Sequence, residues 1–197
     1  LGLVALYGAA ILTSWAGQAA KFPLSRRLIA AGLFTITLAA LTGAARFLTA
    51  QHEILKPPHL WLSNMAGIVG SLWILFGLLQ LRRSLPIPAQ GQYLFPPLIF
   101  VFALLVGQVN LVVLLASALL AVGQLYSLFA LFRQGSVTSA KWMLISLLCL
   151  IAVFGTEALF PDTPHYAWHY YHGVMAIWAF ALIMSVRGVS SKNSASG

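Results

Sequence analysis

The hydrophobic residues of this chain gather into long apolar runs that short polar or proline-containing segments separate. A bilayer core about 30 Å thick requires roughly 20 apolar residues in each crossing helix. The sequence therefore predicts an all-α, polytopic membrane protein, a bundle of seven transmembrane helices in a single domain, residues 1–189, with a flexible cytoplasmic tail, residues 190–197. The predicted helices cover residues 1–20, 28–50, 60–81, 94–107, 111–132, 142–160 and 165–186.

Prolines mark two of the predicted boundaries. The segments HEILKPP, residues 52–58, and FPDTP, residues 160–164, each end in proline just before a predicted helix. Proline is tolerated in the first turn of a helix, because the N–H that it lacks has no partner there. Asp162 or Thr163 can cap the last helix ahead of Pro164.

The composition excludes a soluble monomer and a nucleic-acid-binding domain. Only 7% of the residues are charged and the mean hydropathy is +0.91, whereas a soluble domain carries about 25% charged residues. The net charge of +8 comes from residues in short loops between apolar runs, not from one polar basic face. We expect membrane lipids as partners and no nucleic acid, and the oligomeric state is left open.

The positive charges predict the orientation. Of the 11 Lys and Arg residues, only Arg46 and Lys56 lie outside one set of alternate loops and the C-terminal tail. Because basic loops stay in the cytoplasm, we expect the N-terminus outside and the C-terminus inside. Every histidine and every acid then falls at or near the outer helix ends, namely His52, His59, His165, His169, His172, Glu53, Glu157 and Asp162.

The last predicted helix opens with HYAWHYYHG, residues 165–173, which offers candidate metal ligands. His165 and His169 are four residues apart, so both imidazoles lie on one helical face, a common arrangement for two zinc ligands. His52 is the candidate third ligand, and His59 and His172 are alternates. The competing interpretation is an aromatic belt at the headgroup level.

The HxxWH sequence that opens the last helix, His165 to His169, resembles that of the alkaline ceramidases, which belong to the CREST superfamily of seven-helix membrane hydrolases together with the progestin and adipoQ receptors. The resemblance implies a zinc ion on His52, His165 and His169 and cleavage of a lipid amide or ester. Glu157, late in the sixth predicted helix, matches the place of a family acid and is the candidate catalytic residue, as general base or orienting group. The family's serine is replaced by Leu48, four residues before His52, and the family's aspartate on the third helix is also missing.

Two other functions fit the same residues. Haem held by two of the histidines would indicate electron transfer, although such ligands usually come from facing helices within the bilayer. A non-enzymatic receptor or assembly subunit would explain the departures from the family's site. For the hydrolase we expect a bacterial inner membrane, with the site facing the periplasm. Polar residues within the apolar runs, such as Gln124, are expected to bond a neighbouring helix.

Overall fold

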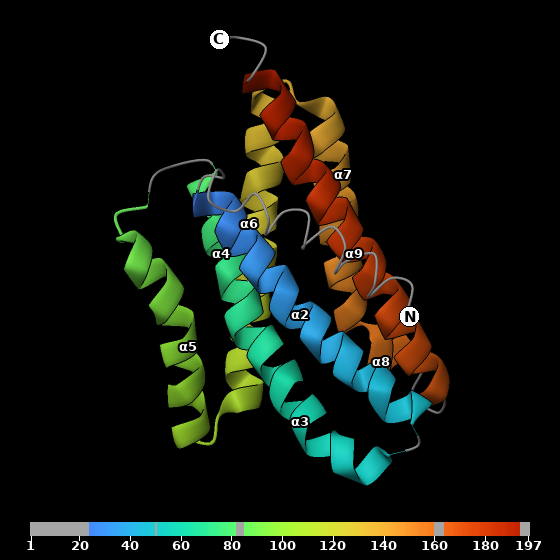
Figure 1. The fold of residues 1–197 in the computed structure, drawn as a ribbon. Coiled ribbons are helices and arrows are strands. Elements are labelled where there is room, and N and C mark those ends of the chain that lie inside the picture. The colour runs from blue at the N-terminus through green and yellow to red at the C-terminus, as the bar shows by residue number, and fades with distance from the viewer. Residues whose placement is uncertain (1–23, 50, 82–84, 160–163, 194–197) are drawn as a thin grey trace. The chain divides into compact units, whose positions relative to one another are not determined.

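The computed structural model describes residues 24–49, 51–81, 85–159 and 164–193, and all regular structure in these ranges is helical (Figure 1). Five helical segments are long and apolar enough to cross a membrane, which supports a multi-pass membrane protein. They are Leu24–Arg46, His52–Gln80, Val109–Arg133, Val137–Phe154 and His169–Arg187. The predicted helix over residues 1–20 lies outside the described residues.

By its internal contacts the chain divides into two compact units, Leu1–Leu120 and Ala121–Gly197, and each is described by itself. The single domain expected over residues 1–189 stays a prediction, as do the count of seven spans and their orientation.

The described part of the first unit is mainly helical. α2 is followed by one unbroken helical span that contains α3, the π-helical turn η2 and α4, and then by α5 and the first half of α6. The bounds are α2 Leu24–Leu48, α3 His52–Met65, η2 Ala66–Gly70, α4 Ser71–Gln80, α5 Ala89–Leu105 and α6 Val109–Arg133. In Figure 1, η2 and α4 lie between α2 and α5.

Glycines bring α2 against the following span at very short range. A methyl group placed on Gly32 would lie 2.5 Å from the carbonyl oxygen of Gly70, and one placed on Gly77 would lie 2.6 Å from the carbonyl oxygen of Ser25. The contacts run in opposite directions along the two helices, so the pair is antiparallel. Small residues that let backbones approach are the usual basis of helix association in membranes.

Two predicted boundaries of this unit were wrong, and both involve paired prolines. HEILKPP, predicted as a connection, is helical and contains Pro57 and Pro58 within α3. The helix predicted to begin at residue 94 begins at Ala89 as α5, and it contains Pro96 and Pro97. A proline leaves the carbonyl four residues earlier without its helical partner. In α3 those carbonyls belong to exposed residues, so water can donate the hydrogen bond that the missing N–H would have supplied.

α5 and α6 each end in a turn of the same type, and each turn depends on a glycine. Gly107 and Gly135 both have a φ of 66°. After α5 the amide of Gln108 donates to the carbonyl of Ala103, and that of Gly107 donates to Leu104, at 3.0 and 3.2 Å. These are the two bonds of a Schellman motif, which needs a left-handed residue at that place.

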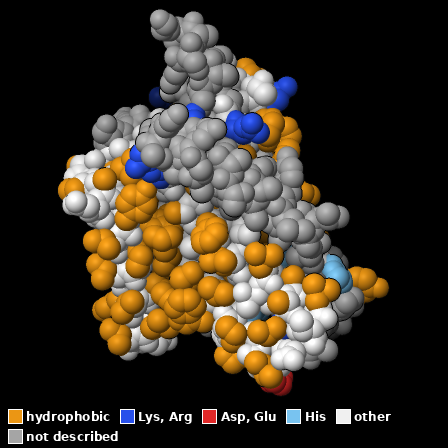
Figure 2. All heavy atoms as spheres, in the orientation of Figure 1, with side chains coloured by type: hydrophobic (Ala, Val, Ile, Leu, Met, Phe, Trp, Pro, Cys, Tyr) orange, Lys and Arg blue, Asp and Glu red, His pale blue; other side chains and the backbone are white. Residues whose placement is uncertain are grey.

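Apolar side chains cover α5 on the face shown in Figure 2, and many of them are more than half exposed. A water-soluble helix would bury such a face, whereas a membrane helix presents it to lipid. The exposed large apolar residues of α5 are Leu94, Phe95, Leu98, Val101, Phe102, Leu104 and Leu105.

The second unit contains the end of α6 together with α7 Val137–Phe154, α8 Thr156–Leu159 and α9 Pro164–Asn193. α7 and α9 lie side by side and antiparallel (Figure 1). The hydroxyl of Ser185 donates to the carbonyl of Ser139 at 2.9 Å, and that of Ser146 donates to the carbonyl of Trp178 at 3.4 Å. α9 reaches Asn193, so it enters the segment 190–197 that was expected to be a tail.

Candidate functional site

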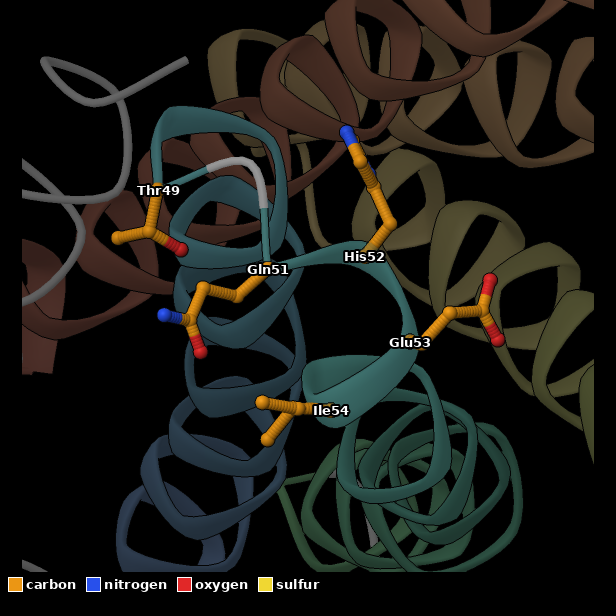
Figure 3. Close-up of a pocket in the computed structure, with 5 residues that line it drawn as sticks. All are labelled: Thr49, Gln51, His52, Glu53 and Ile54. Carbon is orange, nitrogen blue, oxygen red and sulfur yellow. The ribbon is translucent and has the colours of Figure 1, made fainter.

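His52 begins α3 directly after the turn that ends α2. The turn surrounds an open hollow of about 500 Å³. Figure 3 shows that the side chains lining this hollow point away from one another, and that His52 and Glu53 point in different directions. The hollow therefore does not by itself gather an imidazole and a carboxylate around one point. It is lined by Thr49, Gln51, His52, Glu53 and Ile54.

Arg46, near the end of α2, holds the backbone of this turn. Its Nε donates to the carbonyl oxygen of His52 at 3.1 Å, and the hydroxyl of Thr49 donates to the carbonyl of Ala45 at 2.8 Å. A hydrogen bond from a charged donor is stronger than a neutral one. Arg46 thus fixes the position from which the His52 side chain leaves the backbone.

His59, the alternate ligand of the same unit, packs into the contact between α2 and α3. Its Nδ1 lies 3.1 Å from the carbonyl oxygen of Ala39, and because a carbonyl can only accept, Nδ1 carries the proton. The ring also covers Gly43, where an added methyl group would lie 2.8 Å from Cε1 and 3.4 Å from Nε2. The ring therefore packs against α2 at Ala39 and Gly43, which gives His59 a packing role.

The three histidines of the last predicted helix belong to α9, which starts at Pro164 as expected. His169 is exposed and His172 is half-buried. The ring of His172 meets that of Tyr171 edge to face, with centroids 5.2 Å apart. The side chain of His165 lies outside the described part of the structure.

Glu157 lies in α8, a single turn between α7 and α9. Its side chain is also outside the described part. Its neighbour Thr156 is buried and donates its hydroxyl to the carbonyl of Val153 at 2.8 Å. The predicted sixth helix, residues 142–160, is therefore two helices, because α7 ends at Phe154 and Gly155 follows it.

The described side chains include no group of three or more His, Cys, Asp and Glu that could hold one metal ion. The side chains of His165 and Glu157 lie outside the described ones, and His52 belongs to a different unit from His169. The zinc set of His52, His165 and His169 therefore stays a prediction, and so does the catalytic role of Glu157.

A group of polar residues lies inside the second unit, and of these residues sequence reasoning singled out Gln124 alone. Gln124 of α6 donates from Nε2 to the hydroxyl of Ser146 of α7 at 3.2 Å, which confirms the expected bond to a neighbouring helix. Ser127 of α6 and Trp178 of α9 are also fully buried. The available signal was a glutamine in the middle of an apolar run, since such a residue needs a partner in the membrane.

Comparison with protein-family descriptions, with curated proteins and with solved structures found no match for this chain.

Proposed function

We propose that this multi-pass membrane protein binds zinc through α9 and cleaves a lipid amide or ester. The observation that carries the proposal is the unbroken helix from Pro164, in which His165 and His169 stand one turn apart. Residues four apart on a helix lie on one face, so two imidazoles can reach one ion. The donor set fits zinc, which takes nitrogen ligands from histidine and leaves one position open in catalytic sites.

His52 is the preferred third ligand, and His59 and His172 are the alternates. His59 packs against α2 at Ala39 and Gly43, and His172 packs against Tyr171. His52 is exposed at the start of α3, and Arg46 donates a hydrogen bond to its carbonyl. A ligand whose backbone is fixed loses less entropy on binding a metal.

Zinc would supply Lewis acidity for polarising a carbonyl group and activating water. In the proposed reaction Glu157 accepts the proton of the attacking water and returns it to the leaving group. The lipid-facing helices would admit a substrate whose acyl chains stay within the bilayer. An amide or ester near the headgroups would then meet histidines at helix ends.

The test is zinc content and lipid hydrolysis in purified protein. We expect about one zinc per chain in the wild type and its loss in His169→Ala and His52→Ala. His59→Ala is the matched control, because it removes a histidine from the same unit as His52 and should retain the metal. Fatty acid released from a vesicle lipid should disappear in Glu157→Gln while zinc remains.

The other outcomes are equally informative. Zinc lost in His59→Ala but kept in His52→Ala would make His59 the third ligand. A Soret absorbance band would replace the hydrolase with a haem protein. A colourless protein without zinc would refute both and favour a receptor or assembly subunit.

A further inference from the structure

The interior of the second unit holds polar side chains at the middle of its spans. Ser146 lies near the middle of the α7 span, and Trp178 near the middle of the span from His169 to Arg187. Gln124 and Ser127 lie in α6, one turn apart and therefore on one face. The exposed fraction is 0% for Gln124, Ser127 and Ser146 and 1% for Trp178.

Two hydrogen bonds join three helices through these residues. Gln124 donates from Nε2 to the Ser146 hydroxyl at 3.2 Å, and that hydroxyl donates to the Trp178 carbonyl at 3.4 Å. The network thus brings the amide of Gln124 beside the backbone from which the Trp178 side chain leaves.

Three buried atoms of this group have no hydrogen-bond partner among the described residues: Gln124 Oε1, Ser127 Oγ and Trp178 Nε1. Exchanging the oxygen and nitrogen of the Gln124 amide would still leave one of them unpaired. A buried polar atom without a partner loses its hydrogen bonds to water and gains none in exchange. Inside a bilayer no bulk water is present to supply the missing bond. The chain pairs such groups elsewhere, as where the Trp73 indole donates to the Tyr93 carbonyl at 3.1 Å.

We propose that the second unit binds water between α6, α7 and α9, at the level of Gln124, Ser127 and Trp178. The unpaired set consists of one acceptor, one indole donor and one hydroxyl that can do both. Water both donates and accepts, so it can satisfy this mixed set, and buried waters typically make about three such bonds. None of the four residues is charged, which favours an uncharged ligand over an ion.

The experiment is an NMR measurement on protein with nitrogen-15-labelled tryptophan in detergent micelles. The indole proton of Trp178, assigned from its loss in Trp178→Phe, should show a cross-peak to water. Trp73 is the internal control, because its indole is bonded to a protein carbonyl. Its exchange with solvent should be slower than that of Trp178.

Two variants separate bound water from a signal relayed through a hydroxyl. Ser127→Ala removes the nearby hydroxyl, and the Trp178 cross-peak should persist. Gln124→Met with Ser127→Ala removes both anchors at similar volume, and the cross-peak should be lost. No cross-peak in the wild type, or loss in Ser127→Ala alone, would overturn the proposal.

A cross-peak that persists in the double variant would overturn the assignment to Gln124 and Ser127. Stability gives an independent reading. Removing a dry, unpaired hydroxyl stabilises a protein, whereas removing one that holds water does not. Ser127→Ala should therefore lower the Tm by about 2–4 °C, and a rise in Tm would contradict a water-filled site.

Discussion

Gly32→Ala is the sharpest test of how the first unit is packed. The added methyl carbon would lie 2.5 Å from the carbonyl oxygen of Gly70 and 2.6 Å from Cγ1 of Ile74. Non-bonded atoms are most stable about 3.5–4.0 Å apart, so the helices must separate by about 1 Å. The Ile74 side chain can turn aside, but the Gly70 carbonyl belongs to the helix backbone and moves only with the whole element.

The expected change in the free energy of unfolding is the balance of two opposed effects. Forcing an extra carbon into a packed interface costs about 1–3 kcal/mol, and a backbone obstacle favours the upper part of that range. Alanine is a better helix former than glycine by about 1 kcal/mol. We therefore expect Gly32→Ala to lower the free energy of unfolding by about 2 kcal/mol.

The assay is reversible unfolding in mixed micelles by titration with a denaturing detergent, followed by circular dichroism. Gly173→Ala is the matched control, because Gly173 is also helical but has no heavy atom within 4 Å of an added methyl group. It should be neutral or more stable by up to about 1 kcal/mol. If Gly32→Ala proved as stable as this control, the close approach of α2 and η2 would be refuted.

Three further substitutions probe the same two units by unfolding titration. Gly107→Ala should lower the free energy of unfolding by about 1–2 kcal/mol, because Gly107 has a φ of 66°, a backbone conformation that residues with a side chain disfavour. An unchanged stability would contradict the Schellman turn. His59→Ala should cost about 1–3 kcal/mol through the lost bond to Ala39, and no loss would refute the packing role. Ser185→Ala should lower the free energy of unfolding by about 1 kcal/mol by removing the donor to the Ser139 carbonyl, and an unchanged stability would contradict that bond.

The sequence predicted six of the described helical segments because length and hydropathy decide what can cross a bilayer. α6, at Val109–Arg133, nearly coincides with the prediction over 111–132, since polar residues bound the apolar run on both sides. The start of α3 was predicted after Pro57 and Pro58, because paired prolines signal a helix boundary in water-soluble chains. The helix tolerates them where exposed carbonyls can be hydrated.

The candidate site was only partly predictable. The spacing of His165 and His169 follows from helical geometry alone, so the sequence suffices to put them on one face of α9. The packing of His59 depends on Ala39 and Gly43, which belong to another helix. No local pattern states which face of α3 meets α2, and so sequence reasoning kept His59 as an alternate metal ligand.

Sequence alone determined the class of the protein, because apolar run length is a property of the chain itself. It also determined which polar side chains must enter the membrane. Only the tertiary structure decided which of them are satisfied: Ser185 meets the Ser139 carbonyl, while Gln124 Oε1 and Trp178 Nε1 are left for a ligand. The reason is that a hydrogen bond depends on the rotation and depth of two helices together, which neither helix encodes by itself.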